Sequence, residues 1–251
     1  MLNYPIVFSL LALFLLVLAA QIGAALHRRR PLKDDERADF GLVQSAALTL
    51  LGLIIGFSFA MATGRYDLRK NYEEAEANAI GTEYVRAGLL GPADAAKVCA
   101  LLRKYLDLRI LFYQTRNHME LQKVDAETVQ LQSKMWSAVQ VPALAHQTPV
   151  VGLAVSGMND VLNSLGYTQA AWWNRIPTSA WGLMIAIAIG GNLLVGYGTR
   201  SPQPKAGLLF ALPVLVTIAF LLIADIDSPR GGLIHVVPQN LISLSQSLPR
   251  Q

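Results

Sequence analysis

The chain has 251 residues, of which 53% are apolar and only 15% are charged. An average soluble domain carries about 25% charged residues, so this composition indicates a membrane protein. The single cysteine, Cys99, excludes an internal disulfide and a zinc site built on paired thiolates. The net charge of +4 is small and the basic residues are dispersed, which argues against a nucleic-acid partner.

Four stretches without Asp, Glu, Lys or Arg are long enough to cross a membrane, because a spanning helix needs about 20 mostly apolar residues. These stretches are residues 1–27, 40–64, 176–199 and 206–224. We expect a first transmembrane hairpin in residues 1–63, with spans at about 4–26 and 41–63, and a second in 179–224. The first span has no basic residue before it and a long apolar run, which favours a retained helix over a cleaved signal peptide. Aromatic residues near the span ends are typical of interfacial anchors: Tyr4, Trp172, Trp173, Trp181 and Tyr197.

Residues 64–178 have an ordinary soluble composition and helical patterns, which predict an extramembrane helical domain. No proline or turn cluster separates the second span from the start of this domain, so one long helix should leave the membrane and end near Gly88. Its acidic residues Glu73, Glu74 and Glu76 stand among basic ones, which favours a solvated helix face.

Three further helices are expected in this domain. Pro92 should open the first of them, Asp125 should cap the second, and the third should cover about 150–165. The uncharged residues 231–249 are too polar to span, so 225–251 is expected to be a tail packed on protein. The predicted fold is therefore all-α, with two transmembrane hairpins flanking a helical domain.

The sequence holds no pattern typical of catalysis or of a metal centre. Its histidines are scattered, and HExxH, P-loop and Gly-x-Ser-x-Gly motifs are absent. We therefore expect no enzymatic activity, no cofactor and no metal. No charged residue lies inside a span, which argues against a proton-coupled pump but not against a channel with an apolar constriction.

Glycines inside the spans indicate close helix packing. This interpretation applies to the run from Gly190 to Gly198 and to the GxxxG pair Gly52 and Gly56. For the pair, the alternative is a helix that must approach other copies of the chain around a central axis.

The segment GFSFAMATGRYD, Gly56 to Asp67, resembles the end of the pore-lining second helix of bestrophin channels. That helix has Gly-Phe near its middle and, nine residues after the glycine, a basic residue beside aromatic ones. Bestrophins place three apolar residues four apart in the neck of the pore. The resemblance thus implies that Thr49, Leu53 and Phe57 form the neck. Thr49 departs from the apolar pattern of the family because it is polar.

Two further motifs resemble the bacterial bestrophin-like family of unknown function, in the same order along the whole chain. The first continues from RYD into EANAIGTEY, and the second is DIDSPRGGLIHV after the fourth span. The motif residues are Arg65, Tyr66, Asp67, Glu76, Asn78, Asp225, Asp227, Pro229 and Gly231. The resemblance implies a homo-oligomer, a pentamer by analogy, in a bacterial plasma membrane. Its partners would be the lipid bilayer, further copies of the chain and permeant ions.

Calcium-sensitive bestrophins hold the ion with a run of acids after the last span. Here Asp225 and Asp227 are the only acids beyond Lys205, too few for a high-affinity calcium site. We expect these two carboxylates to end the helix and to pair with Arg230 or a neighbouring basic residue.

The sequence leaves two alternatives for the orientation in the membrane and two for the function. The loops 28–39 and 200–205 hold seven basic residues against five beside the spans on the opposite side, which places these loops in the cytoplasm. The resemblance implies the reverse, with the helical domain cytoplasmic. The sequence favours an oligomeric ion channel, and the alternative is a non-conducting scaffold or sensor that binds a partner through the helical domain.

Overall fold

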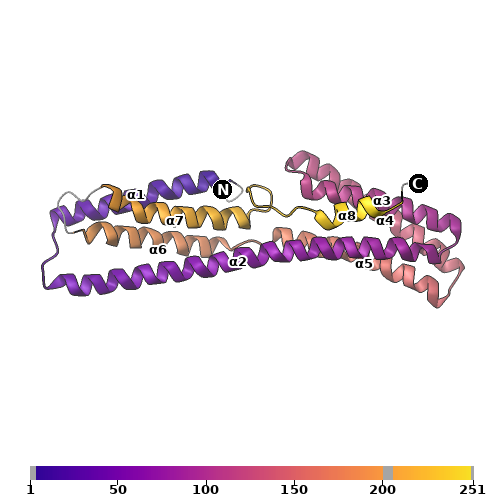
Figure 1. The fold of residues 1–251 in the computed structure, drawn as a ribbon, viewed down its shortest axis with the longest axis horizontal. Helices are drawn as coiled ribbons and strands as arrows, with labels where there is room; N and C mark the ends of the chain where they lie inside the picture. The colour runs from indigo at the N-terminus through magenta and orange to yellow at the C-terminus, as the bar shows by residue number, and fades with distance from the viewer. Residues whose placement is uncertain (1–3, 200–205, 250–251) are drawn as a thin grey trace. The chain divides into compact units, whose positions relative to one another are not determined.

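The computed structural model describes residues 4–199 and 206–249, and every regular element among them is helical (Figure 1). The predicted all-α fold is confirmed. Among these described residues, four helical stretches are long and apolar enough to cross a membrane. The chain divides into two compact units. The membrane unit contains the described residues up to Tyr66 and from Arg175 to His235, and the extramembrane unit contains Asp67–Asn174 and the residues from Val236 onward.

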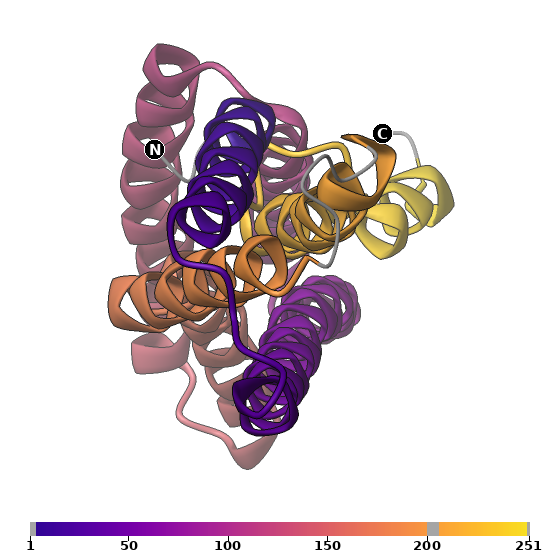
Figure 2. The same ribbon diagram turned by 90° about the vertical axis from the view of Figure 1, so that its left-hand side faces the viewer.

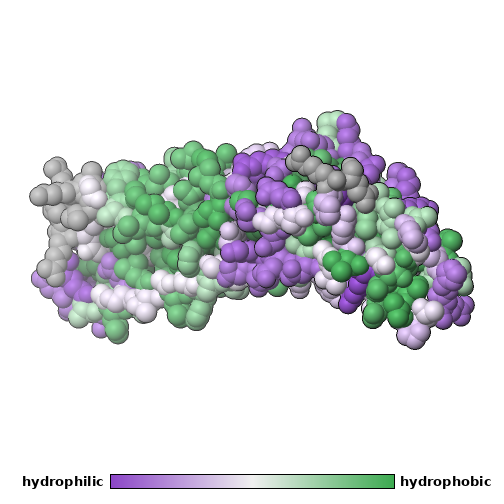
Figure 3. All heavy atoms as spheres, turned by 45° about the vertical axis from the view of Figure 1, so that its right-hand side comes forward, coloured by the Kyte–Doolittle hydropathy of each residue, from purple (hydrophilic) through white to green (hydrophobic). Residues whose placement is uncertain are grey.

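The membrane unit contains α1 (Pro5–Arg29), the first part of α2 (Glu36–Arg86), α6 (Thr178–Tyr197) and α7 (Ala206–Asp227) (Figure 2). Its core consists of apolar side chains from all four helices, among them Leu16, Leu51, Met184 and Phe220. Apolar side chains also cover the outer surface of these helices (Figure 3), as lipid contact requires.

Two of the expected interfacial tryptophans are instead part of the protein interior. Trp181 is buried and meets Phe8 edge to face, with ring centroids 5.0 Å apart. Trp172 is buried against Phe112 in the extramembrane unit. The sequence prediction was wrong for both, because an aromatic residue near a span end can equally fill the core. Trp173, by contrast, is exposed.

Helices α1 and α6 pack backbone to backbone at two glycines. A Cβ atom added to Gly196 would overlap the carbonyl oxygen of Ala20, and one added to Gly23 would overlap that of Leu193. The interpretation of the glycine run as a packing surface is confirmed at Gly196. Without side chains, these positions let the two helix backbones approach closely, which is how helices associate when lipid surrounds them.

The extramembrane unit contains the rest of α2, η1 (Ala87–Leu89), α3 (Pro92–Gln114), α4 (His118–Ala145), α5 (Pro149–Trp173) and α8 (Gln239–Ser247). Helix α2 continues without a break from the membrane unit to Arg86, and α3 begins at Pro92, both as expected. The apolar stripe of α3 is buried, with Val98, Leu102 and Tyr105 fully enclosed.

Two helix boundaries differ from the sequence prediction. Helix α4 begins at His118 because the side chain of Asn117 caps it, accepting a hydrogen bond from the Met119 N–H at 2.9 Å. Asp125 therefore lies inside the helix. Helix α5 continues to Trp173, well beyond the expected end near 165, because no proline lies between Pro149 and Pro177.

The α1–α6 contact gives a direct test. Gly196→Ala should lower the thermal stability of the protein in detergent, because the new methyl group has no room beside Ala20; overpacking of this kind costs about 1–3 kcal/mol. Gly190→Ala, in the same helix, meets no described atom within 4 Å and should be neutral or stabilising. Equal melting temperatures for the two variants would contradict this packing.

Candidate functional site

One face of α2 in the membrane unit carries the residues that the sequence analysis placed in a pore neck. Thr49, Leu53 and Phe57 follow one another at one-turn intervals, and all three are exposed in the single chain. The exposed fractions are 51% for Leu53 and 61% for Phe57. Large apolar side chains with that exposure must meet lipid or another protein surface.

The GxxxG glycines lie beside these residues. A Cβ atom added to Gly52 or to Gly56 would find no atom of the described residues within 4 Å. No helix among the described residues therefore packs closely on this pair. The alternative, contact with another copy, is compatible with this open face.

The opposite face of α2 anchors the helix in the membrane unit. Leu51, Ser58 and Ala62 are buried, and Ile54 and Ile55 pack against the core. Helix α2 thus has one face attached to its own chain and one that the described residues leave uncovered.

Asp227 joins three elements at the end of the membrane unit. Both of its carboxylate oxygens accept the Ile176 N–H, at 3.1 Å, and Oδ1 lies 4.0 Å from Nη1 of Arg65. Arg65 of the RYD motif is therefore a basic partner of this acid. Tyr66 packs against the core beside it, whereas Asp67 is exposed.

Asp225 fastens the turn after α7. Its carboxylate accepts the N–H groups of Leu233 at 2.8 Å and Ile234 at 2.7 Å. Helix α7 ends at Asp227, so both aspartates belong to its last turn. A Cβ atom on Gly232 would lie 2.6 Å from the Asp225 carbonyl oxygen. Gly232 is therefore the glycine of the DIDSPRGG motif that has no room for a side chain.

The remaining residues of this motif differ in their surroundings. Pro229 is buried, and Gly231 is exposed. No cluster of three or more His, Cys, Asp or Glu side chains suited to a metal occurs among residues 4–199 and 206–249.

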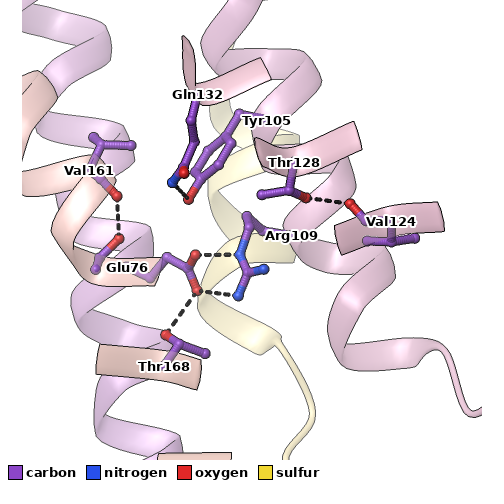
Figure 4. Close-up of polar contacts among 9 residues, drawn as sticks. Glu76, Tyr105, Arg109, Val124, Thr128, Gln132, Val161 and Thr168 are labelled. Atoms are coloured by element: carbon purple, nitrogen blue, oxygen red, sulfur yellow. Dashed lines mark hydrogen bonds and ion pairs between the residues drawn. The ribbon is translucent and has the colours of Figure 1, made fainter. Parts of the chain in front are cut away.

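A buried ion pair lies at the centre of the extramembrane unit (Figure 4). Glu76 of α2 accepts a hydrogen bond from Nε of Arg109 on α3 at 2.5 Å, and Thr168 of α5 donates to the same carboxylate at 3.4 Å. Both charged side chains are fully enclosed. The Arg109 guanidinium also lies over the Phe112 ring, 4.3 Å from its centroid. The pair ties three helices together.

The pairing raises the pKa of Arg109, and its carboxylate also affects the pKa of two neighbouring tyrosines. Burial opposes the positive charge of Arg109, but the Glu76 carboxylate outweighs it, so the pKa of Arg109 is raised. Burial, and then the same carboxylate, raise the pKa of the neighbouring Tyr105 and Tyr113. Arg109 is therefore cationic, and both phenols are neutral.

A second acid of α2 holds the C-terminal helix. Glu73 accepts the backbone N–H groups of Asn240 and Leu241, each at 2.9 Å, and the Asn240 side-chain amide at 2.6 Å. It thereby caps the N-terminus of α8, whose first N–H groups lack helical partners. The C-terminal tail, expected to pack on protein, thus contacts α2 through Glu73.

The prediction of a solvated acidic face on α2 is wrong at Glu73 and Glu76, which are buried, whereas Glu74 is exposed. Asn78, another motif residue, is also exposed and lies outside this network. Arg109 was not among the residues singled out from the sequence. Its signal was a single charge within the apolar stripe of α3, next to Leu108 and one turn before Phe112.

The sequence model of the bestrophin-like domain matches residues 7–241. The chain belongs to the bestrophin-like family. This finding agrees with the resemblance carried by the RYD and DIDSPRGG motifs, which lie within the matched residues. A comparison with curated protein sequences finds no significant match.

Solved structures share the bestrophin-like fold. A crystal structure of a bacterial bestrophin homologue from Klebsiella pneumoniae matches with a TM-score of 0.67 at 14% identity, covering 97% of this chain and 100% of that one. A single-substitution variant of that homologue gives 0.68 at 11% identity, covering 95% and 98%. A structure described as a membrane protein variant gives 0.64 at 13% identity, covering 96% and 99%. At these identities the likeness shows the fold.

The Glu76–Arg109 pair should dominate the stability of the extramembrane unit. Arg109→Met leaves a buried carboxylate without its cation and should lower the free energy of unfolding by about 3–5 kcal/mol. Lys104→Met, on the exposed face of α3, removes the same charge and should change it little. Chemical unfolding in detergent, followed by circular dichroism, measures both. Adding Glu76→Gln to Arg109→Met should restore part of the loss, and absence of that rescue would contradict the pairing.

Proposed function

We propose that this bestrophin-like protein is an oligomeric membrane ion channel whose pore is lined by α2. The observation that carries this proposal is the uncovered α2 face, with Leu53 and Phe57 exposed while the opposite face packs on the core. The family assignment and the fold likeness support it. By analogy with bestrophins, the assembly is a pentamer in a bacterial plasma membrane with the extramembrane unit in the cytoplasm.

The proposed neck acts through apolar side chains. Around a central axis, copies of Leu53 and Phe57 form two stacked rings one helical turn apart, and Thr49 forms a polar ring one turn further. Apolar rings resist wetting and raise the barrier to a hydrated ion. Gly52 and Gly56, beside them, let neighbouring α2 helices approach without side-chain obstruction.

The alternative function is a non-conducting scaffold or sensor that binds a partner through the extramembrane unit. Large apolar side chains exposed around the α4–α5 turn favour this alternative. Val141 and Leu144 are 67% and 66% exposed, and Val150 and Leu153 are about half exposed. Such clustering on a soluble surface is typical of a protein contact.

Ion flux through the neck separates the two functions. Replacing Leu53 and Phe57 by Ala together widens the two rings and removes apolar surface, so the pore should wet more readily. We expect faster ion flux into liposomes, with weaker discrimination among ions and an unchanged oligomeric state.

Ile55→Ala is the matched control for this double variant. Ile55 packs against the core of its own chain, so its truncation should lower stability without raising flux. If the parent and the double variant both stay at the empty-liposome level for several anions and cations, the channel proposal fails and the scaffold gains support.

Assembly is tested at Gly56. Gly56→Leu places a large side chain on the face proposed to meet other copies, and should disrupt the oligomer because close helix approach is blocked. Within one chain the position is open, so the fold of the protomer should survive. Size-exclusion chromatography with light scattering measures the assembly, and circular dichroism checks the fold. An oligomer of unchanged size would contradict the placement of this face.

A further inference from the structure

Glu83, near the end of α2, is a buried acid without a donor. Its side chain is fully enclosed, and neither carboxylate oxygen accepts a hydrogen bond from the part of the chain that the structure describes. The carboxyl group fills a notch on α5 at Gly157, where an added Cβ atom would overlap Oε2. The buried acids Glu73 and Glu76 on the same helix each accept at least two hydrogen bonds.

The charged and titratable groups around Glu83 come from three helices. Arg86, one turn further along α2, borders the same notch, and its Nη1 lies 3.9 Å from the exposed carboxylate of Asp160 on α5. On α3, the Cys99 thiol donates to the Tyr84 carbonyl oxygen at 3.7 Å, and the Arg103 guanidinium lies over the Tyr84 ring. None of these groups hydrogen-bonds to Glu83.

An ionised carboxylate in this position would be unfavourable, because burial without a partner removes its hydration. Burial raises the pKa of Glu83 to about 8, opposed by Arg86 and increased by Asp160. The group is therefore a neutral acid at neutral pH, and it fits its notch in that form.

We propose that Glu83 is a buried proton-binding site that makes the packing of α5 on α2 dependent on pH. In the protonated form the neutral carboxyl stays against Gly157. When it releases its proton to solvent, the carboxylate carries a negative charge and leaves the notch towards the Arg86 guanidinium and water. The contact between the two helices then loosens. This inference is independent of whether the protein conducts ions.

The pH dependence has a defined sign. In the unfolded chain the carboxyl titrates near 4.5, and in the folded protein it titrates near 8. The native state therefore holds more protons than the unfolded state between these values, and stability must fall as pH rises through this window. Below the window both states are protonated and the stabilisation is complete; above it both are ionised and the loss is complete.

Infrared spectroscopy tests the proton directly. The full-length protein in detergent should show the band of a protonated carboxylic acid at about pH 6.5 and lose it by about pH 9.5. Glu83→Gln should abolish this pH-dependent band. Glu74→Gln, which removes an exposed acid from the same helix, should retain it. A band that persists in Glu83→Gln, or is absent from the parent at both pH values, would overturn the proposal.

Hydrogen exchange tests the consequence for packing. After correction for the intrinsic pH dependence, amides of α5 around Gly157 should exchange several-fold faster above the transition in the parent, and not in Glu83→Gln. Should that variant not fold, Glu83→Met replaces an unpartnered neutral group by an apolar one of similar length and should fold as well as the parent at neutral pH. Equal pH dependence in the parent and either folded variant would overturn the proposal, as would failure of both variants to fold.

Discussion

The unbroken backbone of α2 is the constraint on which both units depend. In hydrocarbon every backbone N–H and C=O must be satisfied within the protein, and a helix does this within its own segment. Helix α2 is continuous over 51 residues, with uncharged side chains from Phe40 to Gly64 and most of its charged ones beyond that stretch. A single element thus supplies the proposed pore face of the membrane unit and the acids that organise the extramembrane unit.

Three buried glutamates of α2 show how the extramembrane unit accommodates buried carboxyl groups. Glu73 accepts donors from the start of α8, and Glu76 faces Arg109. Both carboxyl groups therefore have hydrogen-bond donors in a setting where an unpaired charge would be strongly destabilising. Glu83 has no such donor and is neutral at neutral pH, at the cost of a dependence on proton concentration. The same residue type thus serves as a cap, an ion-pair partner and a proton site, according to what the facing helix offers.

Glycine positions distinguish contacts within the chain from those available to other molecules. Gly23 and Gly196 bring α1 and α6 together, so substitution there is expected to damage the protomer. A Cβ atom on Gly52 or Gly56 would meet no atom within 4 Å in the part of the chain that the structure describes, and both glycines share a face with exposed Leu53 and Phe57. Intrachain packing therefore does not account for the GxxxG pair, and this difference underlies the proposal that the α2 face meets other copies.

Local patterns in the sequence determined the helix types, the order of the two hairpins and the family. Long uncharged stretches mark helices that can span a membrane, and Pro92 marks the start of α3. The RYD and DIDSPRGG motifs indicate the family because each is a short contiguous segment of the sequence. Only the tertiary structure decided which acids are buried, because Glu73, Glu74 and Glu76 are the same residue type at nearby positions of α2. Glu73 and Glu76 are covered by other parts of the unit, whereas Glu74 is exposed. The pairing of Glu76 with Arg109 and of Asp227 with Arg65 joins residues far apart in the chain, and no periodicity within one helix encodes the position of its neighbour.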